Sequence, residues 1–220
     1  MSNITLYSYF RSSCSWRVRI ALNLLNIEHE VKHVNLLKNE QNSEWYRRIN
    51  PLGTVPALTS PSFESPIWQS LAIIDFLDKE QSLLPQDPIE RARCLEIALT
   101  IVAEIQPLQN LSVMNRVAQL GGEEEKMKWA LEHNSSKLGI LEKMISGKSN
   151  FSVSNQISLA DICIVPQLYS AQRFGINLSK EFPGLLGIAK KLERIDAFER
   201  AHAHSQADCP NDLRALSKYF

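Results

Sequence analysis

Small hydroxyl and thiol side chains follow the first apolar segment of the sequence. Ser12, Ser13 and Cys14 stand directly before a stretch with helical periodicity. The first N–H groups of a helix lack intrahelical partners and lie at its positive end, so this position suits an anion such as a thiolate. The residue types therefore predict thiolate chemistry. Two alternatives stay open at this point: a serine that only caps the helix, and Cys14 as a small unreactive side chain.

A proline interrupts a second apolar segment. Pro56 follows Val55 within residues 55–58, which otherwise have the pattern of a short strand. Proline cannot donate to a strand ladder. A cis Val55–Pro56 bond would turn the Val55 backbone outward and leave its N–H and C=O free to pair with a peptide ligand. The alternative is a trans proline on an edge strand.

Gln69 and Ser70 begin the next helical stretch. The hydroxyl of Ser70 and the first N–H groups of that helix could hold a carboxylate. The alternative is an ordinary helix cap without a ligand.

The elements that must position these residues fall into two blocks. In the first block, strand alternation and helical spacing indicate the order βαβ followed by ββα, which predicts a small mixed sheet flanked by helices. The expected strands are 4–9, 30–34, 55–58 and 64–68, and the expected helices are 13–25 and 69–79.

Beyond Pro85 and Pro88 the pattern is helical throughout. We expect a long helix from residue 89 that Pro107 bends and Gly121-Gly122 breaks. Farther along, Ser158 and Asp161 have the spacing of a capping box, and a further helix is expected from residue 183 toward residue 200. The predicted organisation is a thioredoxin-like α/β domain over residues 1–82, a linker over 83–88 and an all-α domain over 89–220.

Composition narrows the function classes. The 24 basic residues equal the 24 acidic ones, so no global field favours nucleic acid. No run of about 18 apolar residues occurs, and the sequence begins without a basic segment and an apolar signal core. The four cysteines are scattered, which predicts neither a metal site nor a disulfide framework. We therefore expect a cytoplasmic protein that binds neither nucleic acid nor membrane.

In this order, the three motifs resemble the zeta class of glutathione transferases. The matching segments are 16–22, 50–56 and 69–73, together with 84–88, 105–112 and 161–174, so the resemblance covers nearly the whole chain. It implies the two-domain glutathione-transferase fold and glutathione as cofactor. The residues implied for glutathione are Ser12, Ser13 and Cys14 around its sulfur, Val55 and Pro56 along its cysteinyl backbone, and Gln69 and Ser70 at its γ-glutamyl carboxylate.

The helical domain contributes further residues in this family. The resemblance implies that Gln106, Asn110 and Ser112 take part in the glutathione site, reaching across a homodimer. Arg11 and Arg173 are the candidates for the carboxylates of a dicarboxylic or keto-acid substrate, because a guanidinium fork suits that group. A solvated surface charge is the alternative for each arginine.

The implied activity is a glutathione-dependent cis–trans isomerisation. The first candidate converts maleylacetoacetate to fumarylacetoacetate in tyrosine and phenylalanine catabolism. The alternatives are the isomerisation of maleylpyruvate, glutathione transfer to α-haloacids, and a binding module without activity. A thiol–disulfide oxidoreductase acting through Cys14 is a further alternative.

Two departures from the family pattern lie near the expected γ-glutamyl site. The segment 59–68 is longer than usual and lacks an Asp-Gly turn, and Trp68 precedes Gln69 where a smaller or imidazole side chain is usual.

Overall fold

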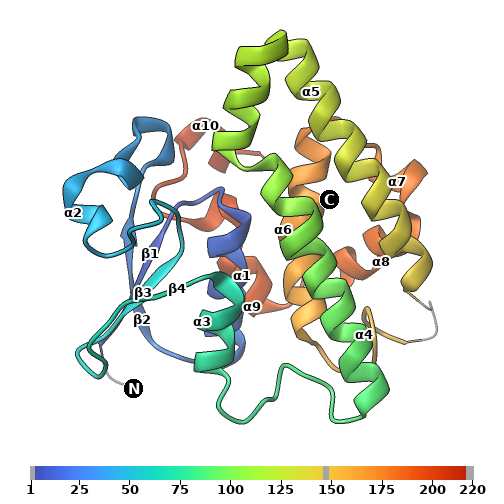
Figure 1. The fold of residues 1–220 in the computed structure, drawn as a ribbon. Coiled ribbons are helices and arrows are strands. Elements are labelled where there is room, and N and C mark those ends of the chain that lie inside the picture. Colours follow the sequence, from blue (N-terminus) through green and yellow to red (C-terminus); the bar gives the residue numbers. More distant parts are fainter. Residues whose placement is uncertain (1–2, 146–148, 217–220) are drawn as a thin grey trace. The chain divides into compact units, whose positions relative to one another are not determined.

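A computed structural model describes residues 3–145 and 149–216 (Figure 1). The contacts divide the chain into two compact units. Among the described residues, the first unit comprises 3–81 and 194–216, and the second comprises 82–145 and 149–193.

The first unit contains a mixed four-stranded sheet. Its strands are β1 (Ile4–Ser8), β2 (His29–His33), β3 (Ala57–Thr59) and β4 (Ile67–Trp68), in the order β2-β1-β3-β4. β1 runs parallel to β2, whereas β3 is antiparallel to both β1 and β4. The predicted mixed sheet is confirmed, although β4 is shorter than the expected strand because most of residues 60–66 form turns and bends.

Helices pack on this sheet through apolar faces. α1 (Ser13–Leu24) buries Trp16, Val18, Ile20 and Leu22, and it packs against α3 (Ser70–Leu77). The predicted helix starts are thus confirmed to within one residue. The remaining short helices of this part are η1 (Leu36–Lys38), η2 (Glu40–Asn42) and α2 (Glu44–Arg47).

The end of the described chain belongs to the first unit. α9 (Asp196–Ala201) packs against α1, and the side chain of Asn23 donates a hydrogen bond to the carbonyl of Ala197 over 2.9 Å. The short helices η5 (Ala203–Ser205) and α10 (Asn211–Arg214) follow. The contacts therefore group these residues with the sheet, whereas the sequence prediction placed them with the helical domain.

The second unit is helical. It contains α4 (Pro88–Leu99), a π-helical turn (Thr100–Ile105), η4 (Gln106–Gln109), α5 (Leu111–Met144), α6 (Leu159–Arg173), α7 (Leu178–Glu181) and α8 (Pro183–Leu192). This confirms the predicted helical character.

Helix breaks in the second unit follow the sequence signals. Pro107 lies in the 3₁₀ segment between α4 and α5, and Gly122 has φ 84° within α5, so the predicted bend and break are confirmed. The Ser158–Asp161 capping box is present at the start of α6. The helix from Pro183 ends at Leu192, earlier than expected, and α9 starts separately.

Among the described residues, no individual helix combines the length and apolarity needed to cross a membrane. In the same residues, one pair of helical segments is long and apolar enough when the two are counted together. These are Pro88–Gln109 and Leu111–Met144, which meet at a bend of 43°.

Candidate functional site

The register of the sheet brings three sequence motifs to one edge of the first unit. Tyr7 pairs with Ala57, and Ala57 pairs with Trp68. The end of β1, the beginning of β3 and the end of β4 therefore lie together. Residues 12–14, 55–56 and 69–70 leave the sheet at this edge, which places the predicted cofactor residues of the first unit in one neighbourhood.

Residues 9–14, here called the thiol turn, connect β1 to α1. Ser12 is the N-cap of α1, and its Oγ accepts a hydrogen bond from the Ser15 N–H over 3.2 Å. Its own N–H donates to the carbonyl of Tyr9 over 3.0 Å. Within the described part of the chain, the N–H groups of Ser13 and Cys14 have no hydrogen-bond partner. The turn can therefore offer two first-turn amides and two hydroxyls to an anion.

A buried guanidinium contacts the thiol of this turn. Arg17 Nη2 donates to Cys14 Sγ over 2.9 Å, and Arg17 is only 1% exposed. Cys14 itself is partly exposed and forms no disulfide. Sequence reasoning did not single out Arg17, since an arginine on a helix is usually a surface residue.

A second buried arginine, Arg19, donates hydrogen bonds to backbone carbonyls of the thiol turn. Arg19 Nη2 donates to the carbonyl of Phe10 over 2.9 Å, and Nη1 donates to Ser8 Oγ over 3.0 Å and to the carbonyl of Tyr9 over 3.3 Å. Burial lowers the pKa of Arg19 to about 9, against an opposing effect of Asp208. The side chain is still protonated at neutral pH, so every one of these contacts comes from a charged donor.

Asp208 holds the same turn from the C-terminal segment. Its Oδ2 accepts a hydrogen bond from the Phe10 N–H over 2.8 Å, and its Oδ1 lies 3.1 Å from His33 Nδ1. Nothing in the local sequence pattern signals this contact, because 198 positions separate the two partners.

The Val55–Pro56 peptide bond is cis, which is one of the two alternatives that the sequence left open. Val55 is 6% exposed, yet within the described residues neither its N–H nor its C=O has a hydrogen-bond partner. Buried peptide groups are nearly always paired. This peptide therefore has the unused hydrogen-bonding capacity that an extended peptide ligand would satisfy.

The segment before Val55 is held by neutral side chains. Tyr46 Oη and Asn50 Nδ2 both donate to the carbonyl of Thr54, over 2.6 Å and 2.7 Å. Asn50 Oδ1 also accepts from the Leu52 N–H over 3.0 Å. Burial raises the pKa of Tyr46, which keeps its phenol protonated. Sequence reasoning missed Tyr46, although its place nine residues before Val55 puts it in the loop that leads to the cis bond.

Gln69 adopts a backbone conformation that is uncommon for a residue with a side chain. Its φ is 69°, and it stands as the exposed N-cap of α3, followed by Ser70, which is 4% exposed. The unusual Trp68 has a defined structural role, because its Nε1 donates to the carbonyl of Ile49 over 2.8 Å. The atypical residue thus ties β4 to the loop before Val55.

The predicted residues of the second unit lie at the junction of η4 and α5 and at the end of α6. Gln106 is buried and donates from its Nε2 to Asn110 Oδ1, so these two side chains meet. Ser112 is exposed in the first turn of α5. Arg173 is exposed, and its guanidinium carbon lies 5.9 Å from the centre of the Phe174 ring. In the first unit, the guanidinium carbon of Arg11 lies 5.7 Å from the Phe10 ring.

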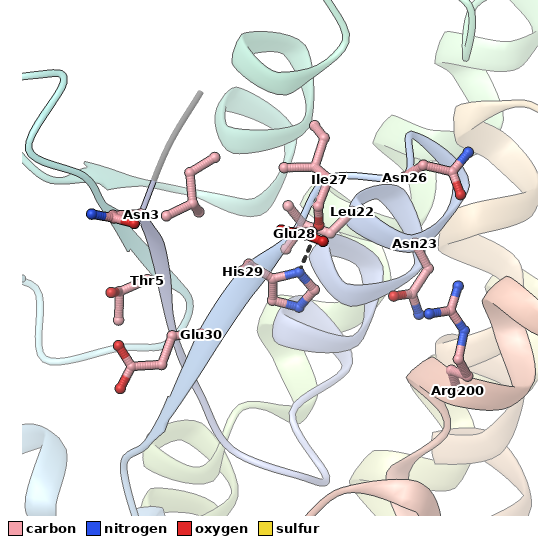
Figure 2. Close-up of a pocket in the computed structure, with 11 residues that line it drawn as sticks. Asn3, Thr5, Leu22, Asn23, Asn26, Ile27, Glu28, His29, Glu30 and Arg200 are labelled. Carbon is pink, nitrogen blue, oxygen red and sulfur yellow. Dashed lines mark hydrogen bonds between the residues drawn. The ribbon is translucent and has the colours of Figure 1, made fainter.

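An open hollow of about 880 Å³ lies at the opposite end of the sheet (Figure 2). It lies between the beginning of β1 and the end of α1, and the Nδ1 of His29 is 2.9 Å from the carbonyl of Ile27 on its wall. None of the predicted site residues lines it. Within residues 3–145 and 149–216, no three His, Cys, Asp or Glu side chains form a group that could bind a metal ion.

Comparison with protein families gives two matches along the chain. Residues 11–80 match the N-terminal domain of glutathione S-transferases, and residues 96–194 match the C-terminal domain. The two regions cover more than half of the sequence.

Individual relatives match over almost their whole length. Maleylacetoacetate isomerase of Mus musculus is 43% identical over 215 residues, which cover 95% of this chain and 96% of the mouse protein. A solved maleylacetoacetate isomerase of Anaeromyxobacter dehalogenans with bound glutathione has a TM-score of 0.85 at 34% identity, covering 94% and 98% of the two chains. A holo maleylpyruvate isomerase, described as a bacterial zeta-class glutathione S-transferase, has a TM-score of 0.88 at 29% identity, covering 94% and 100%.

Proposed function

Because the chain belongs to the zeta class of the glutathione S-transferase family, we propose that it is a glutathione-dependent isomerase that converts maleylacetoacetate to fumarylacetoacetate. The observation that carries the proposal is the group of unused hydrogen-bonding groups at one edge of the first unit, namely the Val55 peptide and the first amides of α1. Both sets of groups could form hydrogen bonds with a bound glutathione molecule. The sequence identity to isomerases over nearly the whole chain indicates which reaction is catalysed.

The residues of the first unit fit glutathione. The N–H and C=O of Val55 would pair with the cysteinyl backbone, and Pro56 fixes the direction of that peptide. Gln69 and Ser70 would hold the γ-glutamyl carboxylate, and the positive φ of Gln69 is the kind of backbone outlier that functional sites retain. The unpaired Val55 groups are the observation on which this fit rests.

Ser12, Ser13 and Cys14 would surround the sulfur. Since Ser12 Oγ already accepts from Ser15, its hydroxyl proton is available for donation to a sulfur anion. Glutathione held here would supply a thiolate whose addition to the conjugated double bond leaves a single bond that can rotate, and whose elimination restores the double bond in the trans form. The helix terminus and the serine hydroxyls favour that anion, because they donate hydrogen bonds from fixed positions. Arg17 adds a buried positive charge beside Cys14.

Residues of the second unit complete the proposal. Gln106, Asn110 and Ser112 would contribute to the glutathione site from across a homodimer, and Arg11 with Arg173 would bind the substrate carboxylates. The homodimer and a cytoplasmic location rest on the family resemblance. Light scattering during size-exclusion chromatography tests the dimer, and a single species of about 25 kDa contradicts it, since the chain has a mass of 25.0 kDa.

The test is a spectrophotometric isomerase assay with glutathione that compares maleylacetoacetate with maleylpyruvate. Higher kcat/KM for maleylacetoacetate supports the proposal. Higher kcat/KM for maleylpyruvate would identify the chain as a maleylpyruvate isomerase instead. Turnover of neither substrate would contradict both isomerase activities. Halide release from an α-haloacid measures the transferase alternative in the same preparation.

The serines are tested by the variants S12A and S13A. The serine that donates to the sulfur should lower kcat by about a hundredfold when it is removed, which is the usual effect of losing one preorganised donor. Loss of the Ser12 cap also costs about 1 kcal/mol of stability, so each variant needs an unfolding measurement. C14A is the companion variant: activity that persists in C14A excludes an obligatory nucleophilic role for that thiol.

A further inference from the structure

The two peptide groups that flank Phe10 are held by charged side chains. In the Tyr9–Phe10 group, the N–H of Phe10 donates to Asp208 Oδ2 over 2.8 Å, and the carbonyl of Tyr9 accepts from Arg19 Nη1 over 3.3 Å. In the next group, the carbonyl of Phe10 accepts from Arg19 Nη2 over 2.9 Å. Hydrogen bonds with an ionised partner are stronger and more directional than neutral ones. The orientations of both peptide groups are therefore set by two residues outside the thiol turn.

Asp208 is itself held in place. The segment that carries it lies in the first unit, where Arg19 Nε donates to the carbonyl of Ala201 over 3.0 Å and the His202 ring packs edge-on against Trp16 at 4.7 Å. Arg214 Nε donates to the carbonyl of Cys209 over 2.9 Å, directly beside Asp208. The side chain of Asp208 is only 16% exposed. The carboxylate thus reaches Phe10 from a fixed support.

The orientation of the two peptide groups that flank Phe10 determines where the residues after them lie. Arg11 and Ser12 come next in the chain, and the carbonyl of Tyr9 accepts from both the Ser12 N–H and Arg19 Nη1. Rotation of the Tyr9–Phe10 peptide group would move the Arg11 guanidinium and tilt the first turn of α1. We propose that Asp208 is a positioning residue, which fixes the thiol turn for its ligand by accepting the Phe10 N–H. The inference rests on the proposed role of this turn in glutathione binding.

A purely structural role would be to anchor the C-terminal segment, and the two roles differ in what a variant changes. D208N keeps an oxygen acceptor for the Phe10 N–H and loses the charge, whereas D208A loses both. D208E keeps the charge and displaces the oxygen. D212A is the matched control, since it removes an exposed aspartate from the same segment, within α10.

The experiment measures kcat and KM of the full chain, together with a binding assay that needs no turnover. Cys14 is alkylated with iodoacetamide at increasing concentrations of S-methylglutathione, which has no free thiol to consume the reagent, and mass spectrometry gives the concentration that halves the rate. We expect D208A to lower kcat and to raise the half-protecting concentration, each by about tenfold, because small misplacements of binding groups have effects of this size or larger. D212A should stay within about threefold of the wild type, and D208N should lie between the wild type and D208A, because it keeps the acceptor for the Phe10 N–H but loses the charge that strengthens the hydrogen bond.

The positioning role is overturned if D208A matches D212A in both kcat and protection while only its unfolding midpoint falls. It is also overturned if D208N loses as much as D208A, because the charge would then matter instead of the acceptor. If D208A does not fold, an impaired D208E with an active D208N supports the proposal, and the reverse pattern contradicts it. Absence of protection in the wild type contradicts the proposed function itself, whereas equal protection of wild type and D208A contradicts only this inference.

Discussion

The two arms of the candidate glutathione site in the first unit are supported in different ways. The thiol turn is held by charged groups, with Arg19 on its carbonyls and Asp208 on the N–H of Phe10. The segment that leads to Val55 is held by neutral groups of nearby residues, with Tyr46 and Asn50 on the carbonyl of Thr54. The turn proposed to bind the sulfur is thus held by charged side chains that are distant in the sequence. The segment proposed to bind the glutathione backbone is held by neutral side chains that are close in the sequence.

The two arms therefore differ in how much stability is lost when one hydrogen-bonding partner is removed. A buried charge is expensive unless it is fully hydrogen-bonded, so loss of one partner of the charged support leaves a large penalty. Neutral hydrogen bonds contribute less each and can be lost singly. The following variants test this contrast in decreasing order of expected effect.

Removal of the charged support should have the largest effect. R19M leaves the carbonyls of Phe10 and Ala201 and the hydroxyl of Ser8 without a donor, so we expect a loss of about 3 kcal/mol or more in the free energy of unfolding. R19K keeps a charge with fewer and less well-directed donors and should fall between wild type and R19M. Urea unfolding followed by circular dichroism measures both, and equal stability of R19M and wild type would contradict the charged-support interpretation.

Asn50 should come next, since one amide serves two backbone groups. N50A removes the donor to Thr54 and the acceptor for the Leu52 N–H, so the expected loss of stability is about 2 kcal/mol. The KM for glutathione should rise while kcat changes little, because Val55 is proposed to contact the cofactor backbone and not its sulfur. A fall in kcat at unchanged KM would break the division between the two arms.

Tyr46 should show a smaller effect with a distinctive pH dependence. Y46F loses one hydrogen bond to Thr54, which predicts a loss of about 1 kcal/mol at neutral pH. The raised pKa of Tyr46 means that the native state keeps its phenolic proton at pH values where the unfolded chain has lost it. The free energy of unfolding of the wild type should therefore fall as pH rises above about 10, and the wild type and Y46F should converge there. Unfolding titrations from about pH 9 to about pH 11 measure this, and parallel pH profiles would contradict it.

The smallest effect is expected at Trp68. W68F keeps an aromatic side chain and loses the hydrogen bond to Ile49, so we expect a loss of about 1 kcal/mol or less. Isothermal titration with glutathione should show a change in affinity of less than about tenfold. A larger change would assign Trp68 a direct part in the neighbouring γ-glutamyl site.

The elements of the fold were predictable because their signals are local. The alternation before Ser8, the spacing of Trp16 and Ile20 and the capping box at Ser158 each involve residues a few positions apart. A proline inside a strand pattern requires an explanation, so the cis bond before Pro56 was one of two alternatives that the local sequence offered. The resemblance to a known family then gave the order of the motifs a meaning that no single motif had.

What the sequence did not reveal is the supporting network. Arg17 and Arg19 have the appearance of surface charges on an amphipathic helix, although both are almost fully buried. Asp208 lies far from Phe10 in the sequence, and no periodicity links positions at that distance. α9 packs against α1, and the contacts group residues 194–216 with the sheet, whereas the sequence prediction placed them with the helical domain.

The return of the C-terminal segment to the sheet has a consequence for synthesis on the ribosome. Residues 3–81 emerge before the helical unit, yet Ala201 and Asp208, which complete the support of the thiol turn, are made only after it. Chains generally fold from the N-terminus as they are made. A nascent chain arrested within the helical unit should therefore carry a folded sheet with a loosely held thiol turn, and it should acquire its full affinity for glutathione only after the last segment has left the exit tunnel.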